Sequence, residues 1–484
     1  MAGNFQHPFL RIQHVDRQST GSQNLLIASS GPRLYSYAAE SGQRLAIWPR
    51  DVDGAEENQE PPEKKRRVSN SKAPENEVSK SAGEAAGKSP VSITWSSIPL
   101  LVASSSGKHV VALTSEDKCI RVFSVGGDGD LEQLSARNMP KRPSAIVLAS
   151  NDTIILCGDK FGDVYSLPLI PGEKPTALPS RPITQTRTQP AATSLTVHSK
   201  KNLQALEQQK RQWNEGYRPE EKTGPAFEHQ VLLGHVSLLT DLVYVSLPDS
   251  KRSYILTGDR DEHIRVSRGP PQAHVIENFC LGHTSFISKL CVPQWAPEYL
   301  VSGGGDSHLL VWKWAESQIL QKVPLVDNAS ETTEVAVRGI WAVSLGTSNV
   351  IIVSLEGSSQ LLCYVLEPAG TLKAQNPIQL SGNVSDLTTA NEAIFVSVDG
   401  VRKTGSTQEW RETPASPQTL LEAFRVKTGS ESLEWEPVQE LAGVINSQGT
   451  SDIIAAAAEG KQRKELDEST YSMANLRKRK GEDD

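Results

Sequence analysis

Two stretches of the sequence decide the fold. The first is LLGHVSLLTDL (232–242) followed by YILTGDRDEHIRVSR (254–268), and the second is LGHTSFISKL (281–290) followed by YLVSGGGDSHLLVWKW (299–314). Both match one template: Gly-His, two spaced apolar positions, a β-rich run, and a Ser or Thr followed four residues later by Asp. Two copies about 48 residues apart, built from short strands and turns, predict blades of a β-propeller.

The polar residues of this template have a structural interpretation. In a WD-type blade, the His, the turn Asp, the strand Ser or Thr and a strand Trp lie close together and link the loop before the blade to its central hairpin. Buried polar groups need hydrogen-bond partners, and a satisfied network specifies a core. We therefore predict a structural role, rather than the alternative of a catalytic His–Asp pair, for His235, Asp261, His283, Ser302, Asp306 and Trp312. Ser267 stands in the first copy where the second has Trp312.

Composition limits the class of protein. The chain has 484 residues, a formal net charge of −7, and five cysteines with no CxxC spacing. The charge argues against a surface built throughout for nucleic acid, and the cysteines indicate a reducing compartment and no zinc site. The N-terminus has no signal-peptide pattern, and no apolar run reaches 18 residues. We expect a soluble intracellular protein that does not enter membranes.

The order of β-like runs predicts an all-β chain forming a single seven-bladed propeller, with six or eight blades as alternatives. We expect an N-terminal strand to close the ring by pairing with the last blade. Two polar segments are too poor in large apolar side chains to fold and are expected to be disordered insertions outside the core. The expected divisions are 1–49, the first blade and closing strand; 50–90, an insertion; 91–170, blades 2 and 3; 171–227, an insertion; 228–436, blades 4 to 7; and 437–484, a charged tail.

Motifs for catalysis and cofactor binding are missing. GEAAGKS (83–89) has three residues between its glycines where a phosphate-binding loop needs four. VGGDGD (125–130) alternates acids but lacks the Glu of a calcium loop, so a tight hairpin loop is the preferred interpretation. We therefore predict no catalytic residue, no cofactor site and no metal site, and a protein that is not itself an enzyme.

A resemblance to a known family rests on the hairpin GDRDEHIRVSR (258–268) with LLGHVSLLTDL before it and FCLGHTSF (279–286) after it. These segments closely resemble the non-catalytic WD-repeat subunit of eukaryotic, fungal-type tRNA (guanine-N7-)-methyltransferase, and CGDKFGDVYSL (157–167) resembles the preceding blade of that family. The resemblance is strongest over about 150–315. The two long insertions are not shared across the family.

The resemblance implies a function. In that family the propeller forms a heterodimer with a separate AdoMet-dependent catalytic subunit, supports its active conformation and so enables N7-methylation of guanosine in the tRNA variable region, with tRNA bound mainly through the complex. It also places the 258–268 hairpin at the subunit contact, with Glu262 and Arg265 as charged anchors and Arg260 and His263 beside them. The residues alone allow a simpler interpretation, a solvated hairpin in which Arg265 points outward, away from the blade interior.

Two other functions stay open from the sequence. One is a generic nuclear WD-repeat scaffold, such as a chromatin or ubiquitin-ligase adaptor, and the other is a propeller enzyme. PPEKKRRV (61–68) looks like a nuclear import signal carried by Lys64, Lys65, Arg66 and Arg67. RKRK (477–480) is a possible second signal or a contact for tRNA phosphates. Solvated charge is the alternative for both clusters. We expect a nuclear protein.

Overall fold

The structure is a computed structural model in which the following residues are described: 4–18, 21–50, 93–172, 203–204, 206–208, 210–211, 227–247, 252–326, 334–346, 348–414, 418–427, 433–455 and 460–478. The predicted import cluster at 64–67, almost all of the insertion at 50–90 and most of the insertion at 171–227 lie outside the described residues. The expectation that these insertions are disordered therefore stays a prediction.

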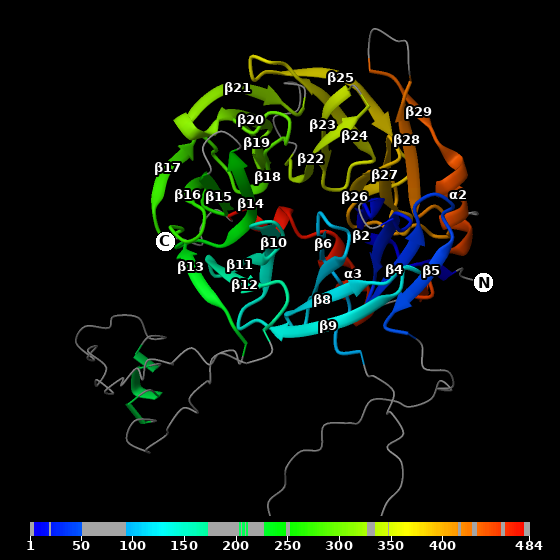
Figure 1. Cartoon of the computed structure of the whole chain (residues 1–484), viewed down its shortest axis with the longest axis horizontal. Coiled ribbons are helices and arrows are strands. Elements are labelled where there is room, and N and C mark those ends of the chain that lie inside the picture. The colour runs from blue at the N-terminus through cyan, green and yellow to red at the C-terminus, as the bar shows by residue number, and fades with distance from the viewer. Residues whose placement is uncertain are drawn as a thin grey trace, which may run out of the picture.

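Seven antiparallel sheets of four strands stand around a central opening (Figure 1). The prediction of a seven-bladed propeller is confirmed. Each sheet takes four consecutive strands, and the first strands of neighbouring sheets contact each other around the ring. Blades 1 to 3 contain β2 (Phe9–Val15), β3 (Leu25–Ser30), β4 (Arg33–Ala38), β5 (Arg44–Trp48); β6 (Leu100–Ala103), β7 (His109–Thr114), β8 (Cys119–Val125), β9 (Leu131–Asn138); β10 (Pro143–Ala149), β11 (Ile154–Asp159), β12 (Asp163–Pro168) and β13 (Gln230–Gly234).

The remaining four blades follow in the same way. Blades 4 and 5 contain β14 (Leu239–Leu247), β15 (Arg252–Asp259), β16 (His263–Arg268), β17 (Ile276–Leu281); β18 (Ile287–Cys291), β19 (Tyr299–Gly304), β20 (His308–Lys313) and β21 (Gln318–Pro324). Blades 6 and 7 contain β22 (Val337–Leu345), β23 (Ser348–Leu355), β24 (Gln360–Leu366), β25 (Leu372–Gln379); β26 (Asn383–Ala390), β27 (Ala393–Asp399), β28 (Leu421–Val426) and β29 (Trp435–Pro437).

The burial of each strand follows its place in the blade. Second strands such as β3 (LLIASS) are buried at every position, because blades pack on both of their faces. Outermost strands such as β9 (LEQLSARN) expose most of their polar residues. The core is therefore a series of apolar layers between adjacent sheets, and the sequence reads as near-continuous apolar runs in the middle strands.

Two details of the predicted domain organisation are wrong. β13 pairs with β12, so the fourth strand of blade 3 lies after the insertion, and blade 4 begins at β14 rather than at 228. The N-terminal strand does not pair with the last blade, which has four strands of its own. Instead β1 (Asn4–Gln6) pairs with β30 (Ile453–Ala455) in a separate two-stranded sheet.

Blades 1 and 7 meet through side chains and hydrogen bonds rather than through a shared sheet. The backbone N–H of Ile12 donates to Asp386 at 3.0 Å, and that of His14 donates to Thr388 at 3.0 Å. Helix α2 (Gln439–Gln448) covers the junction, with Ala442 and Ile445 in an apolar cluster that contains residues of both blades. These contacts close the ring.

The residues after the last blade differ from the charged tail that the sequence predicts. Helix α3 (Lys461–Thr470) and a 3-10 turn, η3 (Ala474–Leu476), follow β30. Leu466 and Thr470 of α3 are buried. The described part of the C-terminal segment is therefore packed on the propeller.

Candidate functional site

The polar residues of blade 5 form a continuous hydrogen-bonded chain. Trp312 Nε1 donates to Ser302 Oγ at 2.8 Å, Ser302 Oγ lies 2.7 Å from His283 Nε2, and His283 Nδ1 lies 2.7 Å from Asp306 Oδ2. All four residues are buried. Burial alone would raise the pKa of the Asp306 carboxyl, but hydrogen bonds from His283 and Thr284 outweigh it and lower this pKa to about 2. The structure thus brings these four residues together as a satisfied network that joins the 282–286 loop to the blade.

In blade 4 the acid of the network is Asp259. His235 Nε2 lies 2.7 Å from Thr257 Oγ1, and its Nδ1 lies 3.4 Å from Asp259 Oδ2. Asp259 also accepts the backbone N–H groups of Asp261 and His263, at 2.9 and 3.0 Å. The assignment of Asp261 to this network is therefore wrong. Blade 5 has Gly304 at the position of Asp259, so alignment by spacing selected the other Asp of the hairpin.

Arg265 stabilises the interior of blade 4. It is only 8% exposed; its Nε donates to Ser267 Oγ at 3.0 Å and its Nη1 donates to Gly234 O at 2.9 Å. In blade 5, Trp312 stands at the position of Ser267, and its ring packs against Gly282 of the Gly-His loop. The Arg265 guanidinium thus links strand β16 to the Gly-His loop where blade 4 has no Trp. The expectation that Arg265 points outward, away from the blade interior, is wrong.

The tip of this hairpin lies at the surface. Glu262 has a φ of 73°, in the left-handed region, and is partly exposed. The His263 side chain is 51% exposed and its Nδ1 lies 3.6 Å from Asp259. Arg260 Nε donates to the carbonyl of Leu476 at 2.8 Å, and Asp261 pairs with Lys478 at 3.0 Å. Of the four predicted partner-binding residues, Glu262 and His263 therefore face solvent, Arg260 holds the C-terminal segment, and Arg265 lies inside the blade.

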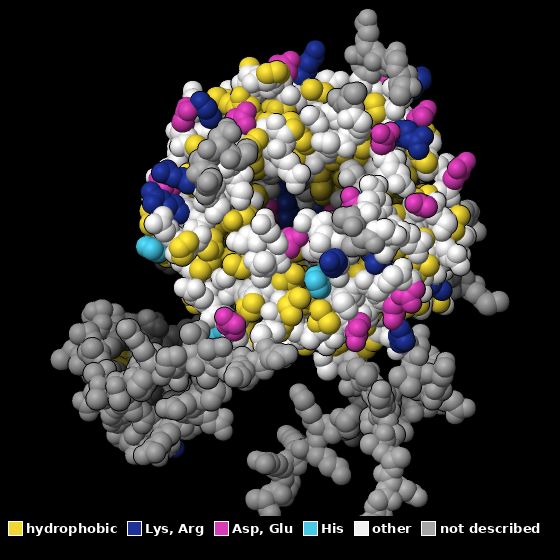
Figure 2. Space-filling model, viewed as in Figure 1, with side chains coloured by type: hydrophobic (Ala, Val, Ile, Leu, Met, Phe, Trp, Pro, Cys, Tyr) yellow, Lys and Arg dark blue, Asp and Glu magenta, His cyan; other side chains and the backbone are white. Residues whose placement is uncertain are grey.

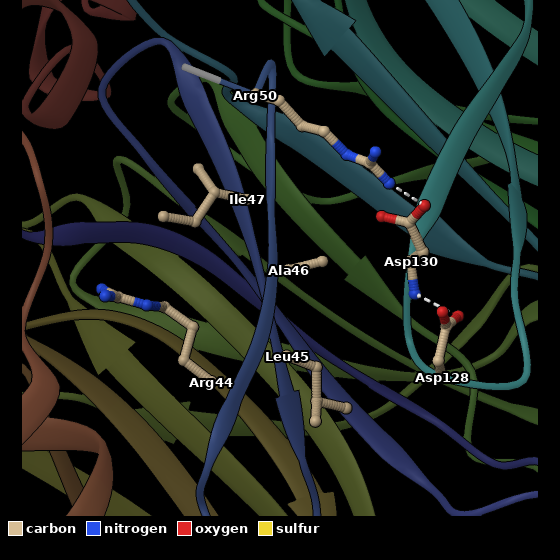
Figure 3. A pocket seen from close by; sticks show the side chains of 7 residues that line it. All are labelled: Arg44, Leu45, Ala46, Ile47, Arg50, Asp128 and Asp130. Atoms are coloured by element: carbon tan, nitrogen blue, oxygen red, sulfur yellow. Dashed lines mark hydrogen bonds and ion pairs between the residues drawn. The ribbon is translucent and has the colours of Figure 1, made fainter. Parts of the chain in front are cut away.

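One surface hollow shows no arrangement for catalysis. It has a volume of about 430 Å³ and lies beside β5 and the β8–β9 loop (Figure 3). Arg50 points to Asp130 and forms an ion pair with it, and the backbone N–H of Asp130 donates to Asp128 at 3.2 Å. The lining contains no His, Cys or Ser that could act as a base or nucleophile. The 125–130 segment forms a hairpin loop there, closed by Gly126 N–H donating to Asp130 O.

Other features of the described residues also bear on function. Within the described ranges, no group of three or more His, Cys, Asp or Glu side chains could hold a metal ion. All five cysteines are buried as free thiols. No helix in the described part of the chain has the length and apolarity needed to cross a membrane. On the face seen in Figure 2, acidic and basic side chains are interspersed around the ring.

Comparison with known proteins identifies the family. The model of the tRNA methyltransferase TRM82 WD40 domain matches residues 26–424. The chain belongs to this TRM82 family. Relatives named tRNA (guanine-N(7)-)-methyltransferase non-catalytic subunit trm82, from Aspergillus clavatus and Aspergillus oryzae, are each 56% identical over 100% of both chains. The relative of the same name from Coccidioides immitis is 42% identical over 99% of this chain and 100% of its own.

The resemblance inferred from the blade 4 hairpin is thereby confirmed, and the alignment with these relatives covers the whole chain. Among solved structures, the RRP9 WD40 repeats superpose with a TM-score of 0.51, cover 90% of this chain and 99% of their own, and share 12% of residues. At that identity the likeness shows the propeller fold alone.

Proposed function

We propose that this chain is the non-catalytic subunit of a tRNA (guanine-N7-)-methyltransferase. It binds and stabilises an AdoMet-dependent catalytic subunit that methylates guanosine N7 in the tRNA variable region, and it meets tRNA mainly within that complex. The observation that carries the proposal is the 56% identity, over the full length of both chains, to relatives named as non-catalytic subunits. The relatives' names do not favour a generic scaffold or a ubiquitin-ligase adaptor.

The geometry of blade 4 suits a docking surface. Its hairpin tip is set by Asp259, which accepts two backbone N–H groups and one His side chain, so the tip is rigid before any partner arrives. Rigid presentation lowers the entropic cost of binding. We propose that Glu262 and His263 contact the catalytic subunit directly. Arg265 then acts as a positioning residue, since it anchors strand β16 behind the tip.

Reconstitution tests the proposed function. The chain and its cognate catalytic subunit are expressed alone and together, and each preparation is assayed for complex formation and for methyl transfer from AdoMet to tRNA. We expect a stable heterodimer, activity that is highest in the complex, and no methyl transfer by this chain alone. Failure of the two purified proteins to associate, or methylation by this chain in isolation, would refute the proposal.

We also propose a nuclear location, supported by the basic cluster Lys64, Lys65, Arg66 and Arg67. The second cluster, 477–480, is a weaker candidate signal, because Arg477 and Lys478 both contact the propeller. Import receptors bind extended, accessible basic segments, and a docked segment is not free to adopt that form.

A further inference from the structure

After its last blade the chain crosses one face of the propeller. Residues 460–478, here called the C-terminal strap, contain α3 and η3 and appear in red behind the central opening in Figure 1. They start beside blade 7 and end against the hairpin of blade 4, with contacts to blades 6 and 5 on the way. The strap therefore connects the closing end of the ring to the surface proposed above for partner binding.

Buried charges hold the first half of the strap. Arg402 is fully buried and pairs with Asp399 at 2.8 Å and with Asp467 of α3. The Tyr471 hydroxyl donates to Asp399 Oδ2 at 2.8 Å. Arg338, in the first strand of blade 6, donates to the carbonyl of Thr470. A buried guanidinium without partners is strongly unfavourable, so residues 467–471 are part of the folded propeller.

Backbone groups hold the second half. The two carboxylate oxygens of Glu356 accept the N–H groups of Met473 and Ala474, each at 2.8 Å. Arg477 Nη2 donates to Val335 O at 2.8 Å and to Gly305 O at 3.1 Å, and its guanidinium lies 5.6 Å from the centre of the Phe286 ring. These contacts fix the chain direction up to the point where it meets blade 4.

The strap changes what the hairpin presents. Arg260 is engaged by Leu476 O, and the charge of Asp261 is met by Lys478. The strap contributes two cations beside the hairpin tip, Arg477 and Lys478, whose side chains are 30% and 44% exposed. Each cation has a partly exposed acidic neighbour: Arg477 lies 3.8 Å from Glu334, which is 75% exposed, and Lys478 pairs with Asp261, which is 39% exposed. The strap therefore adds two positive charges to a surface of mixed charge that also contains Glu262 and His263.

We propose that the strap end, residues 473–478, and the blade 4 hairpin form one composite surface that receives the catalytic subunit. This rests on the proposed function and deepens it by adding the strap to the interface. The chemistry of the surface fits a partner face with carboxylates placed near Arg477 and Lys478, which lie at the rim beside Glu334 and Asp261. Opposite charges at a rim steer association and fix orientation. The strap remains in place on binding, since its anchors are interior groups of the propeller.

A pair of truncations tests the proposal. A chain ending at Lys478 keeps every strap contact described here and is the matched control. A chain ending at Tyr471 keeps the buried anchors around Arg402 and loses the strap end. We expect the control to bind the catalytic subunit within about twofold of the full chain, and the shorter chain to bind at least about tenfold more weakly, equivalent to about 1.4 kcal/mol. The loss should shrink at higher salt, because rim charges are screened.

Thermal melts of the isolated proteins accompany the binding assay. If the shorter chain does not fold, Glu356→Ala in the full chain releases the strap end without truncation, and Glu367→Ala, an exposed Glu of the same blade that accepts a hydrogen bond from Thr371, is its control. Weaker binding with Glu356→Ala alone supports the composite surface.

Equal binding by both truncations would overturn the proposal. Tighter binding by the shorter chain would also overturn it, since the strap would then cover the docking surface. If the full-length chain does not bind the catalytic subunit, the proposed function itself is refuted. If the full-length chain binds, the binding of the variants tests only the role of the strap.

Discussion

Replacing Arg265 by Ala should destabilise the isolated propeller, even though a partner-binding role was the first expectation for this residue. The change removes two hydrogen bonds from a charged donor, to Gly234 O at 2.9 Å and Ser267 Oγ at 3.0 Å, and truncates a side chain that is only 8% exposed. Hydrogen bonds to charged groups contribute about 1.5–3 kcal/mol each, and relief of the desolvation of the guanidinium offsets part of this. We expect a net loss of about 2–4 kcal/mol in the free energy of unfolding.

Arg268→Ala is the matched control, three residues further along the same strand. The Arg268 side chain is 36% exposed and pairs with Glu277 at 2.5 Å. Exposed ion pairs contribute about 0–1 kcal/mol, so this variant should unfold close to the wild type. Arg265→Lys should recover only part of the loss, because an ammonium group cannot reproduce the two-pronged geometry of the guanidinium.

Guanidinium chloride unfolding followed by tryptophan fluorescence measures all three variants. If Arg265→Ala has the same unfolding midpoint as both the wild type and Arg268→Ala, the interior hydrogen bonds of Arg265 contribute nothing to the free energy of unfolding. That result would refute the reasoning. A fourth variant, Arg265→Glu, separates folding from binding. An Arg265→Glu protein that melts normally but no longer captures the catalytic subunit would return Arg265 to the interface.

Three further outcomes are expected. The pKa of Asp306 is about 2 in the folded protein and its ordinary value is 3.8, so its ionised form stabilises the fold above about pH 4 by about 2 kcal/mol, and this stabilisation is lost as pH falls toward 2. The free energies of unfolding of the wild type and of Asp306→Asn, measured against pH, should therefore converge in acid. Parallel curves would contradict this. Calorimetric titration of the isolated chain with AdoMet should show no binding heat, and micromolar saturation would count against a non-catalytic role. A fluorescent fusion with Lys64, Lys65, Arg66 and Arg67 changed to alanine should move to the cytoplasm, and unchanged nuclear signal would make the cluster ordinary solvated charge.

The blades could be predicted from the sequence because each is a local unit with a repeated pattern. The blade 5 network followed from spacing, since His283, Ser302 and Asp306 lie within one repeat. Spacing failed in blade 4, where Asp259 and Asp261 both occupy the hairpin and only the backbone geometry shows which one meets His235. Alternation within a strand likewise predicts which side chains share a face. It does not predict whether that face contacts solvent or a neighbouring loop, as at Arg265, which donates to Gly234 O.

Longer-range pairings left weaker signals. Strand β13 joins β12 across the 171–227 insertion, and local patterns cannot assign a strand to a sheet that began before such a gap. The two-stranded sheet of β1 and β30 pairs the ends of the chain, more than 440 residues apart (Asn4 with Ala455), through only three residues on each side. Such pairings form when the rest of the fold brings the partners together, and the sequence of either strand alone does not specify them.

The strap is the feature with the least signal in its own residues, since 460–478 is polar and contacts the propeller through backbone carbonyls and ion pairs. The signal lies instead in the propeller. VAVRGIW (335–341) places a single Arg inside an apolar strand run, and burying an unpaired guanidinium there would cost more than the strand gains from its neighbours. Arg338 must therefore meet acceptors within reach of the inner strand, and the structure supplies them from Ser385 at 2.8 Å and from Thr470 of the strap. A lone Arg in a buried strand thus indicates that acceptors lie close by. One of them here belongs to the neighbouring blade, and the other belongs to the segment that carries the chain to the hairpin of blade 4.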